Sequence, residues 1–69
     1  MIVRDRTGQV WLLGFEPYQY PTIVVATEEI SPSLFTHLVV RLDNTDRSFE
    51  LDESIHLAFE RRDDMKRLA

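Results

Sequence analysis

The chain has 69 residues, of which 43% are hydrophobic, so we expect an ordered protein with a single small domain over residues 1–69. Its formal net charge of −4 argues against nucleic acid as a partner, because affinity for polyanions comes mostly from lysine and arginine without acids beside them. The absence of cysteine excludes disulfides and thiolate metal sites, and no apolar run approaches the roughly 20 residues needed to cross a membrane. A cytoplasmic protein without a membrane segment is therefore predicted.

The opening of the chain is predicted to be a β-hairpin. Residues 2–4 and 9–13 are strand-like, and the turn at 5–8 joins them. The turn ends in Gly8, which suits the positive φ of a bulge.

A loop, a central strand and a connection are expected next. Residues 14–21 contain two prolines, which interrupt a regular ladder, so we expect a loop there. The β-branched run at 22–27 predicts a central strand. Residues 28–33 are predicted to be a connection, because Pro32 bars continuation of the strand.

Residues 34–42 form the longest predicted strand. Its side chains alternate between two faces. One face carries Leu38, Val40 and Leu42, and the other carries Phe35, His37, Val39 and Arg41. A polar turn at 43–46 then leads to a short strand at 48–51.

The tail is predicted to contain a helix over 53–62, which Asp52 or Ser54 can cap. Alternate residues of this segment also fit strand spacing. Two alternatives stay open for 63–69: it continues the helix, or 65–68 is a closing strand that pairs with the first.

The apolar runs decide the expected fold. Three segments, 10–13, 23–26 and 38–40, are apolar at every position, which predicts strands with both faces out of water. One helix can cover only one face, so either the sheet curls on itself or a partner covers the second face. We expect a mainly β fold with a C-terminal helical segment: a small curled antiparallel sheet forming an SH3-like partial barrel.

The sequence predicts no catalytic, cofactor-binding or metal-ligating residue, and no enzyme. On a helix, His56 shares a face with Asp52 and Glu60, but a metal site needs three or four convergent ligands. His37 is interpreted as a packed or interface histidine, because no serine or threonine stands in the setting of a nucleophile. The two glycines form no phosphate-binding loop.

Two groups of residues are candidates for binding a partner. Phe15, Tyr18 and Tyr20 lie on a stiff proline-containing segment and have the composition of binding hot spots, although rings that cap the open end of a small barrel are the favoured alternative. The second candidate is the strand face with Phe35, His37 and Val39, which would stay exposed on a closed barrel and could form a homodimer.

A cationic group near the C-terminus provides the alternative function. Acids are interleaved with these cations, which is typical of a solvated, salt-bridged surface. The group consists of Arg61, Arg62, Lys66 and Arg67. We therefore expect a non-enzymatic interaction module or small regulator that binds a larger host protein, and the alternative is a nucleic-acid-associated accessory protein.

Two segments resemble a group of small proteins from actinobacteria and their phages. The opening Asp5-Arg6-Thr7-Gly8-Gln9-Val10-Trp11 is similar to their Asp-Arg-x-Gly-x-Val-Trp start, and the tail at 53–68, with FERRDDM at 59–65, is similar to theirs. The likeness covers about a third of the chain. It implies a compact cytoplasmic protein and brings no activity, cofactor or functional residue.

Overall fold

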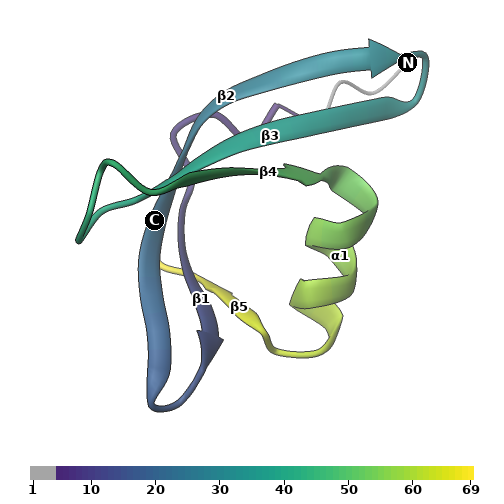
Figure 1. Ribbon diagram of the computed structural model, residues 1–69. Helices are drawn as coiled ribbons and strands as arrows, with labels where there is room; N and C mark the ends of the chain where they lie inside the picture. Colours follow the sequence, from purple (N-terminus) through teal and green to yellow (C-terminus); the bar gives the residue numbers. More distant parts are fainter. Residues whose placement is uncertain (1–4) are drawn as a thin grey trace.

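A five-stranded antiparallel sheet packs one face against a single helix (Figure 1). The computed structural model describes residues 5–69. Its elements are β1 (Val10–Phe15), β2 (Tyr18–Ser31), β3 (Leu34–Arg41), β4 (Ser48–Asp52), α1 (Glu53–Arg61) and β5 (Met65–Arg67). The strand order is β4-β3-β2-β1-β5. The expected mainly β fold with one helix near the C-terminus is confirmed, and no helix in residues 5–69 is long and apolar enough to cross a membrane.

The sheet is not closed or strongly curled, so the predicted SH3-like partial barrel is wrong. The two edge strands, β4 and β5, do not pair with each other. Helix α1 joins them instead, and it runs beside the sheet from the end of β4 toward the start of β5 (Figure 1). The core is therefore closed on one side by the helix, and not by a ladder between the edges.

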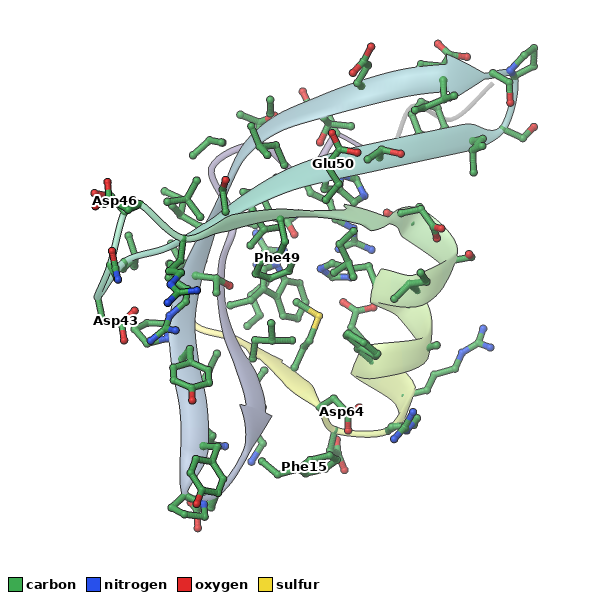
Figure 2. The ribbon with its side chains drawn as sticks, in the orientation of Figure 1. Phe15, Asp43, Asp46, Phe49, Glu50 and Asp64 are labelled. Atoms are coloured by element: carbon green, nitrogen blue, oxygen red, sulfur yellow. The ribbon has the colours of Figure 1, made fainter. Side chains whose placement is uncertain are left out.

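The face of the sheet toward α1 holds the core. We call it the inner face and the opposite one the outer face. The buried apolar side chains are Trp11, Val24, Val39, Leu51 and Met65. Figure 2 shows the alternation on β4, where Phe49 points toward the core and the next residue, Glu50, points away.

The expectation that Phe35, His37 and Val39 form an exposed row is wrong. All three are buried on the inner face, and His37 is 0% exposed. The side chains exposed on β3 and just after it are Leu38, at 37%, and Leu42, at 48%. Since the strand is apolar on both faces, its pattern does not say which face the helix covers.

The predicted loop at 14–21 is instead a tight hairpin. Strand β1 continues to Phe15 and β2 begins at Tyr18, so only two residues form the connection. Pro21 is accommodated in the strand because its carbonyl accepts from Leu42 N at 2.9 Å, which places its nitrogen on the β3 side and away from the β1 ladder. Gly14 has φ +111, and a Cβ there would collide with the Tyr18 carbonyl.

The predicted connection at 28–33 is also mostly strand. Strand β2 includes the expected run at 22–27 and then continues to Ser31, and the turn is confined to Pro32 and Ser33. The expected first strand, 2–4, lies outside the described residues. The predicted positive φ of Gly8 is confirmed at +89.

The helix and the strand after it follow the sequence closely. Asp52 caps α1 by accepting from Ile55 N at 2.9 Å, while Ser54 donates to the Asp52 carboxylate. Of the two alternatives for 63–69, the strand is confirmed, but it pairs with β1, within the segment predicted as the second strand, and Met65 lies opposite Leu13. The predicted pairing with 2–4 lies outside the described residues.

Trp11 is predicted to carry a large part of the stability. It is 5% exposed, so Trp11→Ala should lower the free energy of unfolding by about 3–5 kcal/mol, the range for deleting a large buried aromatic side chain. Phe15→Ala, at the exposed hairpin end, is the control and should change it little. Urea unfolding measures both. A Trp11 variant as stable as the control would contradict this placement.

Candidate functional site

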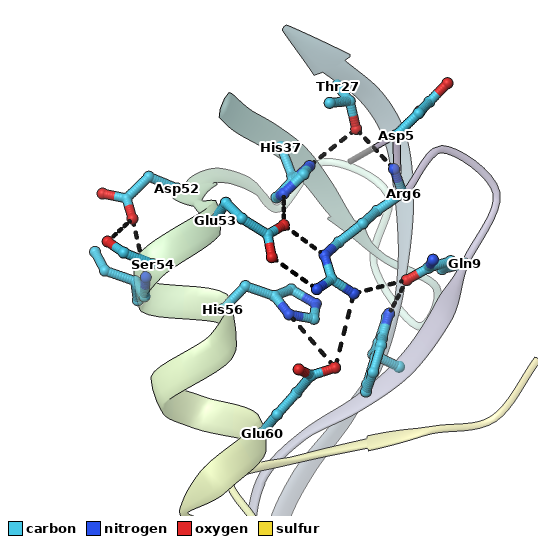
Figure 3. Close-up of polar contacts among 12 residues, drawn as sticks. Asp5, Arg6, Gln9, Thr27, His37, Asp52, Glu53, Ser54, His56 and Glu60 are labelled. Atoms are coloured by element: carbon cyan, nitrogen blue, oxygen red, sulfur yellow. Dashed lines mark hydrogen bonds and ion pairs between the residues drawn. The ribbon is translucent and has the colours of Figure 1, made fainter. Parts of the chain in front are cut away.

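A buried ion pair links the segment before β1 to the start of the helix (Figure 3). Arg6 Nε donates to Glu53 Oε1 at 2.7 Å and Arg6 Nη2 donates to Glu53 Oε2 at 2.8 Å, a two-pronged contact. Arg6 Nη1 also donates to Gln9 Oε1 at 3.2 Å, and the Trp11 indole donates to the same oxygen at 3.0 Å. Both members of the ion pair are buried.

His37 extends this network into the sheet. Its Nε2 lies 2.8 Å from Glu53 Oε1, and its Nδ1 lies 2.9 Å from Thr27 Oγ1. Because a carboxylate can only accept, Nε2 carries the hydrogen, and in the neutral ring the Thr27 hydroxyl then donates to Nδ1. The same hydroxyl accepts from the Arg6 backbone N–H at 3.1 Å. We call Arg6, Gln9, Thr27, His37 and Glu53 the Arg6 cluster.

The Arg6 cluster keeps Glu53 ionised. Burial opposes the charge on this carboxylate, but hydrogen bonds from Arg6 and His37 outweigh it and lower the pKa of Glu53 from 4.5 to about 2. Glu53 is also in the first turn of α1, where the helix dipole favours a negative charge.

His56 lies beside the cluster as a neutral ring. It is fully buried, and its nitrogens form no hydrogen bond with the described residues. Its ring packs edge-on to Trp11 with centroids 4.7 Å apart, and Glu60 Oε1 is 3.8 Å from Nδ1. Burial, followed by the positive charge of Arg6, lowers the pKa of His56 from 6.5 to about 4. His56 therefore acts as an aromatic core residue at neutral pH.

Thr27, His37 and Glu53 follow the order hydroxyl, imidazole, carboxylate, which is the order of a nucleophilic triad. Their other contacts favour an anchoring role. Both Glu53 oxygens bind Arg6, the Thr27 hydroxyl binds the Arg6 backbone, and His37 has no exposed surface. Within residues 5–69, no group of three or more histidines or acids is arranged to hold a metal.

The outer face of the sheet is apolar, and α1 does not cover it: Ala26 and Leu38 are exposed there, and the other apolar residues of this face are half-buried. Residues directly opposite each other in neighbouring strands share a face, and the register places Ile23 between Val10 and Val40, and Ala26 beside Leu38. Leu12 completes the set on β1. We call Val10, Leu12, Ile23, Ala26, Leu38 and Val40 the outer apolar patch. Helix α1 lies on the other side of the sheet, so it leaves this patch open to a partner.

The predicted aromatic group lies elsewhere. Phe15 and Tyr18 are register partners at the end of the β1–β2 hairpin, and both are exposed. Tyr20 is half-buried under the Arg41 guanidinium, which lies 3.9 Å from its ring centroid. By register these rings share the side of Trp11 and Leu13, so they do not adjoin the outer apolar patch.

The four predicted cations do not form one patch. Arg61 and Arg62 are at the end of α1, and Arg62 lies 3.6 Å from the Asp64 carboxylate. Lys66 and Arg67 are consecutive on β5, so their side chains leave opposite faces of the strand.

Sequence reasoning missed the Arg6 cluster. It placed Arg6 in the hairpin turn at 5–8 and Glu53 at the start of the predicted helix. The two are 47 residues apart, and no local spacing indicates that they meet. A weak signal was present: His37 is a polar residue within an apolar strand face, and a buried histidine needs partners.

Comparison with protein-family models, with curated proteins and with solved structures finds no match to this chain. The resemblance to small actinobacterial and phage proteins therefore stays a prediction.

Acid should weaken the fold through Glu53. The folded pKa of Glu53 is about 2 and its ordinary value is 4.5, so the unfolded chain takes up this proton first as the pH falls. Stability from this group is complete above about pH 4.5 and is lost toward pH 2. Glu53→Gln should remove this loss and, at neutral pH, cost about 3–5 kcal/mol by leaving Arg6 buried without its partner.

The control is Asp43→Asn, which breaks the exposed pair with Arg41 and should change stability little. Denaturant unfolding between pH 2 and pH 7 measures all three proteins. If Glu53→Gln and Asp43→Asn lower the free energy of unfolding equally, the ion pair between Arg6 and Glu53 is not a buried, stabilising one.

His56 should produce a second, milder pH dependence. Its folded pKa of about 4 is below the ordinary 6.5, so the unfolded chain binds this proton more readily. The free energy of unfolding should therefore fall as the pH drops from about 6.5 to about 4. His56→Leu should remove this pH dependence, because leucine has no group that binds a proton. Its similar volume keeps the core packed. Thermal melts across the range, run in parallel for both proteins, check it. The same dependence of stability on pH in the wild type and in His56→Leu would contradict the prediction.

Proposed function

We propose that this chain is a non-enzymatic protein-interaction module that binds a larger protein or a second copy through its outer apolar patch. The observation that supports this function is the outer apolar patch, with Ala26 and Leu38 exposed, on a sheet whose inner face already holds the core. Scattered apolar residues are normal on a protein surface, whereas a contiguous set marks an interaction site.

The pattern of the strands supports the same function. An antiparallel sheet with one solvated face usually alternates apolar and polar residues. Strand β1 does not alternate, because Trp11 and Leu13 pack on the inner face while Val10 and Leu12 are apolar on the outer face. Apolar residues on the solvent side add little to the stability of a monomer, but they stabilise a complex when a partner buries them.

The outer apolar patch also lies on a rigid support. On the inner face, the core and the Arg6 cluster hold β1, β2, β3 and α1 together. A preformed surface loses less conformational entropy on binding than a flexible one does, which favours affinity.

Leu38→Glu should abolish binding without unfolding the protein. Leu38 is 37% exposed on the outer face, so a carboxylate there remains hydrated in the free protein but would be buried in a complex. Ile55→Glu is the matched control, because Ile55 is 43% exposed on the helix, away from the patch. Affinity capture from cytoplasm with each protein immobilised, together with circular dichroism, measures the effect.

We expect the wild type and Ile55→Glu to retain the same proteins and folded Leu38→Glu to lose them. Retention of the same proteins by all three would contradict the proposed surface.

A further inference from the structure

We infer that a second copy of this chain covers the outer apolar patch, in a symmetric face-to-face dimer. This inference rests on the proposed function, and it names the partner of that surface. It comes from the charges at the two rims of the face. Glu50 on β4 lies opposite Leu38, and Lys66 on β5 lies opposite Leu12. Both charges therefore share the face of the patch.

The two charges lie on opposite edges of the sheet. The strand order is β4-β3-β2-β1-β5, so Glu50 is on one edge strand and Lys66 is on the other, with the apolar residues between them. An apolar centre with a charged rim is the ordinary arrangement of a protein interface. Four strand spacings of about 4.8 Å separate β4 from β5, so Glu50 and Lys66 of one copy cannot pair with each other.

In a dimer with a two-fold axis, however, Glu50 of one copy can pair with Lys66 of the other copy. Glu50 is level with Ala26 and Lys66 is level with Pro21, five residues away along β2, so the axis must lie between the two faces and run oblique to the strands. Around such an axis, the Glu50 rim of one copy can face the Lys66 rim of the other. Glu50 then lies near the partner's Lys66, and Lys66 lies near the partner's Glu50. An isologous interface requires such self-complementarity, since each surface meets an identical one. Opposite charges on opposite rims meet this requirement.

Two other acids share the face by register and do not oppose this arrangement. Glu28 and Asp52 both lie opposite Thr36, one on each side of β3. Asp52 is occupied as the cap of α1. Glu28 is two residues beyond Ala26 toward the β2–β3 turn, so it borders the patch at that end.

The size of the face predicts a reversible dimer. Five strands at about 4.8 Å spacing and some five residues along each strand, at roughly 3.3 Å per residue, cover a few hundred Å² per copy. Stable complexes usually bury about 800 Å² per partner, so this area is at the low end of specific interfaces. We therefore expect a dissociation constant in the micromolar range.

Sedimentation equilibrium tests the dimer, with wild-type samples from about 0.3 μM to about 300 μM, a range that brackets micromolar affinity. The mass should rise from 8.1 kDa toward twice that value. Glu50→Lys and Lys66→Glu should each stay monomeric alone, because the rims then repel. An equimolar mixture of the two should associate, because both rim pairs become attractive between unlike copies. Ile55→Glu is the control and should dimerise like the wild type.

Three outcomes would overturn the inference. These are a wild type with the mass of one chain at every concentration, a mixture of charge variants that does not associate, and charge variants that dimerise as the wild type does. If the wild type is monomeric but captures other proteins that Leu38→Glu loses, the proposed function stands and the second copy is excluded. If the wild type is monomeric and all variants retain the same proteins, both proposals fail. If Leu38→Glu unfolds, Glu50→Lys and Lys66→Glu still test the dimer, because both substituted residues are exposed.

Discussion

The buried pair between Arg6 and Glu53 is the contact on which the rest of the inner face depends. It joins the segment before β1 to the first turn of α1, two parts of the chain 47 residues apart. Glu53 also receives His37 from β3, so one carboxylate connects three separate elements. Burying a charge is costly, and this one is tolerated because both oxygens are hydrogen-bonded and because the N-terminus of the helix favours a negative charge.

The two faces of the sheet have different roles because of this arrangement. The inner face contains the core, the Arg6 cluster and the neutral ring of His56. The polar groups of the Arg6 cluster hydrogen-bond one another. The contacts of Thr27, His37 and Glu53 with Arg6 favour an anchoring role, although the order of the three groups resembles a triad. The outer face keeps the apolar patch and its two charged rims, so binding is proposed where the fold leaves apolar area uncovered and not where its titratable groups are concentrated.

Local signals predicted several elements well and failed where a long-range contact was needed. The cap at Asp52, the helix after it and the positive φ of Gly8 are confirmed, since each depends on neighbouring residues only. The prolines of 14–21 suggested a loop, but Pro21 lies in a strand because its nitrogen faces away from β1. The Arg6 cluster could not be predicted, because its members meet only after the sheet and the helix have packed.

By itself, the sequence determined the central strands, the capped helix and that one apolar face would need a cover, although it missed the strand residues within 14–21 and 28–33. Runs such as 10–13 and 38–40 are apolar at every position, so they predict burial on both faces whatever the topology. Only the tertiary structure decided which face became the core. Helix α1 packs on the side of Phe35, His37 and Val39, and the Glu53 it carries meets Arg6 there. The physical reason is that both faces of β3 offer apolar area, whereas only the inner one provides partners for a buried charge.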